Sequence, residues 1–315
     1  GKAEVYGCSY DKISRFFAAY SSGDRTRSFL KVQDGCDYKC AYCTIHYARG
    51  ASRNIPIADI VKEAEEIVAA GQKEIVITGV NTGDFGRTTG EKFVDLLRAL
   101  DKVEGVERYR ISSIEPNLIT DEIIELCASS PKFMPHFHIP LQSGSTKLLG
   151  AMRRRYTADK YRERIQKIRE LMPDSFLGVD VIVGFPGEGE EEFMESYRLL
   201  EEVGASFLHI FPFSERPGTP AVAMPNKVQS RIATERVERL EKLSNRLHAD
   251  FARRYLGTER PVLFESTNRS GEMLGYTDNY LRVRAPYNER YINQITTVRL
   301  IELLDENDIR CEIVG

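Results

Sequence analysis

The stretch Val32–Gly50, VQDGCDYKCAYCTIHYARG, places Cys36, Cys40 and Cys43 in one short loop. Thiolates are soft ligands that suit iron-sulfur clusters, zinc or Cu(I), and a C-x3-C-x2-C spacing lets one loop reach three corners of a cubane. A structural zinc site needs four ligands, so zinc requires one more Cys or His, and His46 is close enough in sequence to be considered. A zinc knuckle therefore stays open as an alternative. A 4Fe-4S cubane held by three thiolates keeps one iron open for a substrate.

The motif C-x3-C-x-aromatic-C, formed by Cys36, Cys40, Tyr42 and Cys43, resembles the signature of radical S-adenosylmethionine (SAM) enzymes. In that family the open iron chelates the amino and carboxylate groups of SAM. The longer string RTRSFLKVQDGCDYKCAYC, followed by ARGASRN, is similar to the tRNA methylthiotransferases and closest to their threonylcarbamoyladenosine branch. His46 departs from the proline expected there, which affects the local turn and not the cluster.

The resemblance implies a defined activity. One SAM donates a methyl group to sulfur, and a second is cleaved to a 5'-deoxyadenosyl radical that takes hydrogen from C2 of a modified adenosine beside the tRNA anticodon. The implied partners are tRNA and an electron donor such as a flavodoxin or ferredoxin. A relative that methylthiolates an aspartate of a ribosomal protein is the alternative within this enzyme class, and a zinc-stabilised RNA-binding module is the alternative outside it.

Full-length relatives also carry an N-terminal domain whose three cysteines hold a second 4Fe-4S cluster, which supplies the sulfur. Here Cys8 is the only cysteine before Cys36, and the 35 preceding residues are too few for such a domain. We therefore expect a shortened chain or an unusual member, without visible ligands for a second cluster.

Composition sets broader limits. A chain of 315 residues that is 42% hydrophobic can bury a large core and predicts two domains. The net charge of -3 means that RNA must be held by local patches. The six cysteines, including Cys127 and Cys311, do not form the pattern of a secreted disulfide framework, and no apolar run is long enough to span a membrane. We expect a cytoplasmic monomer.

From Ser28 onward an apolar run, a loop with Gly, Pro or Asn, and an amphipathic helix follow one another repeatedly. The predicted strands are 29–33, 74–79, 108–113, 137–141, 177–184 and 206–211. The predicted helices are 57–68, 93–100, 119–127, 161–171 and 193–203. Six β-α units predict an α/β fold, a partial (β/α)6 TIM-like barrel, which the radical SAM resemblance also implies.

The loops that follow parallel strands gather at one end of such a barrel and carry its chemistry. The candidate cofactor-binding residues are Tyr42, Thr78, Gly79, Asn81, Ser113, Glu115, Gln142, Arg154, Asp180 and Phe211. By resemblance, the loop at Gly79 meets the SAM amino group, Glu115 accepts the ribose hydroxyls, Tyr42 packs beside adenine, and Arg154 pairs with the methionine carboxylate or with RNA phosphate. We expect His136, His138 and His209 to be hydrogen-bonded core imidazoles.

The last part of the chain has a different pattern. Residues 217–220, PGTP, mark a boundary, a long helix is predicted from about 228 to 255, and short strands are predicted at 261–265, 273–277, 281–285 and 297–304. They predict a small antiparallel β-barrel that resembles the TRAM domain, a tRNA-binding module. The Arg and Tyr residues expected to bind RNA are Arg269, Arg282, Arg284, Arg290, Tyr276, Tyr280, Tyr287 and Tyr291. The predicted division is 1–27 (lead-in segment), 28–220 (partial barrel), 221–255 (bridging helix) and 256–315 (TRAM-like barrel).

Overall fold

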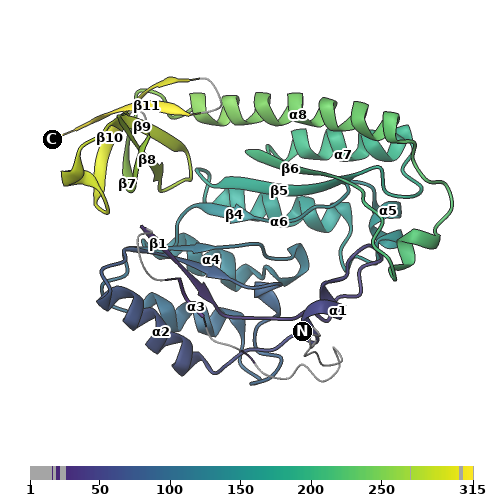
Figure 1. Cartoon of the computed structure of the whole chain (residues 1–315), viewed down its shortest axis with the longest axis horizontal. Coiled ribbons are helices and arrows are strands. Elements are labelled where there is room, and N and C mark those ends of the chain that lie inside the picture. The colour runs from purple at the N-terminus through teal and green to yellow at the C-terminus, as the bar shows by residue number, and fades with distance from the viewer. Residues whose placement is uncertain (1–15, 17–18, 22–25, 270, 305–307, 315) are drawn as a thin grey trace, which may run out of the picture.

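The structure is a computed structural model that describes residues 16, 19–21, 26–269, 271–304 and 308–314 (Figure 1). Cys8 and most of the predicted lead-in segment lie outside these residues. The helices α1 to α8 are Ile45–Arg49, Ile57–Ala69, Phe93–Asp101, Asp121–Ser129, Thr146–Ala151, Ala158–Leu171, Glu190–Glu202 and Ser230–Arg253. No helix among the described residues is long and apolar enough to cross a membrane.

The first part of the chain is an open half-barrel of parallel strands. Strands β1 to β6 are Arg27–Lys31, Glu74–Thr78, Arg108–Ile111, His136–His138, Phe176–Val183 and Phe207–Pro212. They pair in the orders β1-β2-β3 and β4-β5-β6, and a parallel bridge between Tyr109 and Phe133 joins the two sheets. In Figure 1, α2 and α3 lie below the first sheet, and α7 and α8 lie above the second. The predicted partial TIM-like barrel is confirmed.

The main core lies between the strands and the outer helices. Ile75 and Ile77 of β2 are fully buried in it, together with Ile60 of α2 and Leu97 of α3. Because side chains alternate along a strand, the residues between these apolar ones face the other side, the inner face of the half-barrel. We call the space beside this inner face the lumen.

Strands β7 to β11 close into the predicted C-terminal barrel, in the order β10-β11-β9-β8-β7. Their bounds are Glu259–Arg269, Glu272–Thr277, Arg282–Pro286, Ile295–Leu303 and Ile309–Ile313. Pairing is antiparallel except between β11 and β9, which run parallel. The long helix α8 bridges the two parts, running along the top of Figure 1 toward the yellow barrel.

Charged residues at the amino ends of the half-barrel strands attach the C-terminal barrel. Arg108 donates to the carbonyl of Pro261 at 2.8 Å, and Arg110 donates to the carbonyl of Thr277 at 2.8 Å. Glu74 accepts from Arg110 at 3.0 Å, and both side chains are only 1% exposed. The barrel therefore covers the amino ends of the strands, so the cysteine loop lies at the opposite end.

Candidate active site

The cysteine loop begins directly after β1 and is closed on itself by backbone pairing. Asp34 and Arg53 exchange backbone hydrogen bonds of 3.0 and 2.9 Å, and the Arg53 guanidinium binds the Asp34 carboxylate at 3.0 Å. Gly35 has a φ of +72°, and a Cβ there would lie 2.0 Å from the Ala51 carbonyl oxygen. Only glycine fits this turn.

The three thiols lie among hydrogen-bond donors suited to metal-bound sulfur. The Tyr38 N–H lies 3.4 Å from Cys36 Sγ, and the Ile45 N–H lies 3.4 Å from Cys43 Sγ. Burial raises the pKa of the Cys36 thiol to about 12 and also raises the pKa of the Cys40 thiol. Bound metal favours the thiolate over the thiol, so cluster binding would release these protons.

The number of thiols bears on the choice of metal. A structural zinc site is closed by four ligands, whereas a 4Fe-4S cubane held by three thiolates keeps one iron open. The loop supplies three cysteines. It therefore fits a 4Fe-4S cluster better than zinc.

Arg154 joins three of the predicted residues, although they are far apart in sequence. Its Nη1 lies 3.2 Å from Cys40 Sγ and 3.4 Å from the Tyr42 hydroxyl, and its Nη2 binds the Glu115 carboxylate. Burial raises the pKa of Glu115, and Arg154 opposes this rise. The Arg154 side chain is 4% exposed. It therefore lies beside the cysteine loop and not on a surface that RNA phosphate can reach.

The loop after β2 approaches the cysteine loop through Gln33. A Cβ on Gly79 would lie 3.0 Å from Gln33 Oε1, which accepts from the Asn81 N–H at 2.9 Å. The Gln33 amide donates to the Gly35 carbonyl at 2.8 Å, so one buried side chain connects both loops. Gln33 was not among the predicted site residues, although a polar residue at the end of an apolar strand is a usable signal.

Asn81 has the hydrogen-bonding capacity expected of a ligand-binding group. Asn81 is 4% exposed, and neither polar atom of its side-chain amide has a hydrogen-bond partner among the described residues. Buried polar groups are nearly always hydrogen-bonded, so this unpaired amide indicates a place where a ligand can bind. Thr78 ends β2 beside it. The carbonyl of Ser113 accepts a hydrogen bond from the Thr82 hydroxyl at 2.8 Å, which holds the loop after β3 against the loop after β2.

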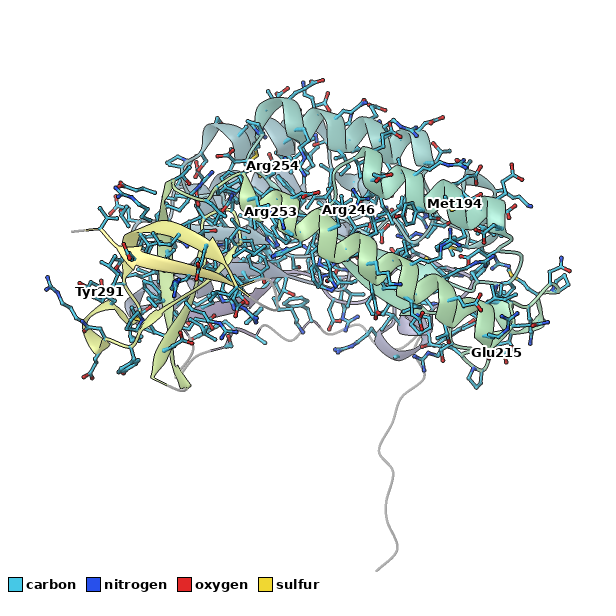
Figure 2. All side chains as sticks on the ribbon, turned by 90° about the horizontal axis from the view of Figure 1, so that it is seen from above. Met194, Glu215, Arg246, Arg253, Arg254 and Tyr291 are labelled. Atoms are coloured by element: carbon cyan, nitrogen blue, oxygen red, sulfur yellow. The ribbon has the colours of Figure 1, made fainter. Side chains whose placement is uncertain are left out.

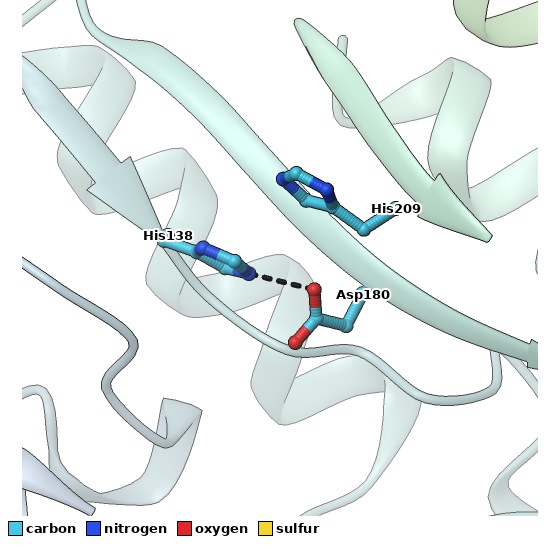
Figure 3. Close-up of side chains that lie close together, drawn as sticks. All are labelled: His138, Asp180 and His209. Carbon is cyan, nitrogen blue, oxygen red and sulfur yellow. Dashed lines mark hydrogen bonds and ion pairs between the residues drawn. The ribbon is translucent and has the colours of Figure 1, made fainter. Parts of the chain in front are cut away.

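The remaining predicted residues lie on β4 to β6 or directly after them. Gln142, with a φ of +64°, is fixed by backbone hydrogen bonds to Asp180 and Ile182 at 2.8 and 2.9 Å. The Asp180 carboxylate binds His138 at 2.7 Å (Figure 3). Phe211 is 51% exposed near the end of β6.

The prediction that His138 and His209 are core imidazoles is wrong. His138 is partly exposed, and His209 is exposed and stacks on it with ring centroids 5.0 Å apart. The alternation of side chains along β4 and β6 turns both rings to the lumen, whereas the apolar core lies behind the strands. His136 is partly exposed, and its ring stacks on Tyr280 with ring centroids 3.9 Å apart.

Comparison with known proteins identifies the family of this chain. Residues 30–200 match the Radical SAM superfamily. The threonylcarbamoyladenosine tRNA methylthiotransferases MtaB of Bacillus subtilis and Thermotoga maritima are 44% and 38% identical over 89% and 96% of this chain. This chain belongs to the radical SAM tRNA methylthiotransferase family. The matches span 63% and 68% of those relatives, so the chain corresponds to about two thirds of their length.

One further relative and one solved structure are also similar to this chain. The tRNA-2-methylthio-N(6)-dimethylallyladenosine synthase of Wolinella succinogenes is 37% identical over 96% of this chain and 71% of its own length. The radical SAM methyltransferase TsrM from Kitasatospora setae, solved with cobalamin and a [4Fe-4S] cluster, superposes with a TM-score of 0.52 at 16% identity. It covers 76% of this chain and 42% of its own, and it supports the fold alone. Radical SAM enzymes use a 4Fe-4S cluster and SAM.

Four of the residues predicted to bind RNA have structural contacts instead. Arg282 and Arg284 both bind the buried carboxylate of Asp308. Tyr276 and Tyr280 stack on each other at 4.8 Å. Both tyrosines also lie against arginines of the half-barrel, at the junction of the two parts. The alternating Arg/Tyr pattern did not distinguish this junction from a solvated strand.

The other predicted RNA contacts lie farther out on the barrel. Arg290 lies over the Tyr291 ring at 5.9 Å, and Tyr287 is 38% exposed. Figure 2 shows Tyr291 at the outer end of the barrel, away from Arg246 on α8. The side chain of Arg269 lies outside the described part of the chain.

Proposed function

We propose that this protein installs a methylthio group at C2 of N6-threonylcarbamoyladenosine beside the tRNA anticodon. The observation that carries the proposal is the convergence of the cysteine loop with Glu115, Arg154 and Asn81 at the carboxyl end of the half-barrel. The names of the MtaB relatives suggest the substrate. None of the relatives described above is a ribosomal-protein methylthiotransferase, so that alternative is not favoured.

In this proposal Cys36, Cys40 and Cys43 hold the cluster. When bound, the cluster and SAM supply a 5'-deoxyadenosyl radical that takes the hydrogen atom from C2 of the target base. The backbone N–H groups of Tyr38 and Ile45 and the guanidinium of Arg154 donate to the sulfurs. Such donors stabilise negative charge on cysteine ligands and tune the cluster.

The neighbouring loops bind SAM. In this proposal the unpaired Asn81 amide and the backbone at Gly79 face its amino group, and Glu115 accepts its ribose hydroxyls. Arg154 positions Glu115 and opposes the rise in the Glu115 pKa that burial causes. Tyr42 packs beside the adenine. Ser113, Gln142 and Phe211 form the remaining walls of the proposed SAM site.

We also propose that the C-terminal barrel binds tRNA through Arg290, Tyr287 and Tyr291. A guanidinium next to an aromatic ring suits phosphate pairing together with base stacking. An external electron donor such as a flavodoxin or ferredoxin reduces the cluster. The sulfur donor expected in the family is a second 4Fe-4S cluster, which is additional to the one that Cys36, Cys40 and Cys43 of this chain hold in this proposal.

The test is isotopic and does not depend on sulfur supply. The reconstituted protein is incubated anaerobically with SAM, dithionite and tRNA that carries deuterium at C2 of the target adenosine. Mass spectrometry of the 5'-deoxyadenosine product should detect one deuterium. The matched control is tRNA with deuterium at C8 of the same base, from which no transfer is expected.

Cleavage of SAM without deuterium transfer from C2 would contradict the proposed reaction. Transfer from a deuterated aspartate of a ribosomal protein, with none from tRNA, would identify the alternative enzyme instead. Absence of SAM cleavage together with one bound zinc would identify the zinc-stabilised RNA-binding module.

A further inference from the structure

Three polar side chains that the proposed chemistry does not use lie together in the lumen. His138 ends β4, and Asp180 and His209 lie on the next two strands, where they are register partners. Figure 3 shows the three side chains close together, and their ligand atoms all lie within 4.8 Å of one another. Val179 and Leu208, which alternate with them, are buried in the core.

These side chains retain hydrogen-bonding capacity. The His138 Nε2 to Asp180 Oδ1 distance of 2.7 Å uses one oxygen of the carboxylate. His209 is exposed and has ring contacts but no hydrogen bond among the described residues. Partial desolvation by the surrounding protein atoms and the neighbouring His138 lower the pKa of His209, which favours a neutral ring with one donor and one acceptor.

The trio lies between the proposed SAM site and a cavity. The negative charge of Asp180 contributes to the raised pKa of Glu115, so the two carboxylates are within electrostatic range. On the other side, His138 and His209 line a cavity of about 460 Å³, which Phe207 and residues of the C-terminal barrel also border. A group held by the trio is therefore adjacent to the radical source and has space around it.

A metal ion fits this arrangement less well than an organic group. Metal–nitrogen bonds of about 2.1 Å place two ligand nitrogens within about 3.4 Å, with both ring planes directed at the ion. The rings of His138 and His209 are nearly parallel, at 12°, so their in-plane lone pairs do not converge. His138 is also already hydrogen-bonded to Asp180.

We propose that His138, Asp180 and His209 bind the N6 substituent of the target adenosine and select a polar substituent. This inference rests on the proposed function. C2 and N6 lie on the same edge of adenine, so a site for the N6 substituent must lie close to the radical source. A threonylcarbamoyl group offers N–H and O–H donors to Asp180 and oxygen acceptors to His209. A dimethylallyl group offers neither, and it leaves the polar side chains unpaired.

The test compares two anticodon stem-loops, one with N6-threonylcarbamoyladenosine and one with N6-dimethylallyladenosine. Binding to the full chain with its reconstituted cluster is measured by fluorescence anisotropy at one fixed salt concentration. We expect the threonylcarbamoyl loop to bind about tenfold more tightly, the effect of one well-made polar contact. His209→Phe should reduce the preference to below about twofold while SAM affinity is unchanged, and Asp180→Asn should reduce the preference to a similar extent. Asp95→Asn on the outer helix α3 is the matched control and should keep the preference.

The inference alone is overturned by equal binding of both loops by the unaltered protein, by a preference that survives both substitutions, or by one equivalent of zinc that the substitutions remove. Loss of SAM binding in Asp180→Asn also overturns it and assigns Asp180 to the cofactor. Failure of the unaltered protein to bind either loop overturns the proposed tRNA function together with this inference.

Discussion

At the residue scale, the account depends on which cysteines bind iron. Replacing Cys40 by Ala should abolish the visible absorbance of the reconstituted cluster and the reductive cleavage of SAM, because two thiolates cannot hold a cubane that needs three. Cys127→Ala is the matched control. Cys127 is 2% exposed on the buried face of α4, so its replacement should leave both signals intact. Full SAM cleavage by the Cys40 variant would contradict the assignment.

Arg154 gives a second test at this scale. Arg154→Lys keeps the charge but cannot contact Cys40, Tyr42 and Glu115 together. The dissociation constant for SAM should rise by about tenfold, the effect of one lost charge-assisted hydrogen bond. The iron content should not change. Arg162→Lys on the outer helix α6 is the control, and equal SAM affinity in both variants would contradict the positioning role of Arg154.

At the element scale, the shape of the cysteine loop can be tested with two glycines of similar backbone conformation. Gly35 and Gly90 have φ values of +72° and +77°. A Cβ on Gly35 would lie 2.0 Å from the Ala51 carbonyl oxygen, whereas a Cβ on Gly90 meets nothing within 4 Å. Both Gly→Ala changes carry a backbone cost of about 1 kcal/mol, but only Gly35→Ala should lower iron binding. Equal iron content in the two proteins would show that the tight turn is not needed.

Much of the fold could be predicted from periodicity, because its elements bury one face each. Helix α2 follows the predicted apolar face, with Ile60, Ala64 and Ile67 buried. Strand β11 was missed, although Ile309 and Cys311 alternate with charged residues. The short strand β4 also ends at His138, earlier than its apolar run predicts.

The site was predictable only where a local motif marks it. The spacing of the cysteines identifies the cluster loop, and the loops after parallel strands identify Glu115 and Asn81. The bridging contacts of Gln33, and the meeting of His138 with His209, depend on how separate strands are aligned. No local pattern contains that register, so these contacts required the structure.

At the scale of the whole molecule, the half-barrel and the C-terminal barrel should unfold as one unit. The buried pair of Arg110 and Glu74 holds the junction, and Arg110→Ala leaves the Glu74 carboxylate buried and unpaired. We expect a loss of about 3–5 kcal/mol in the free energy of unfolding, measured by urea denaturation. Arg98→Ala removes an exposed pair and should cost less than about 1 kcal/mol. Similar losses in both proteins would show that the junction is not a stabilising contact. The domain boundaries and the monomeric state stay predictions.

The central claim is that the cysteine loop of this chain holds a cluster that cleaves SAM. Anaerobic reconstitution, followed by iron and sulfide analysis and a 5'-deoxyadenosine assay under dithionite, tests it most directly. We predict about four irons per chain, the content of one cubane, and SAM cleavage that is absent from Cys36→Ala. About one zinc per chain, no visible absorbance and no 5'-deoxyadenosine would contradict the account.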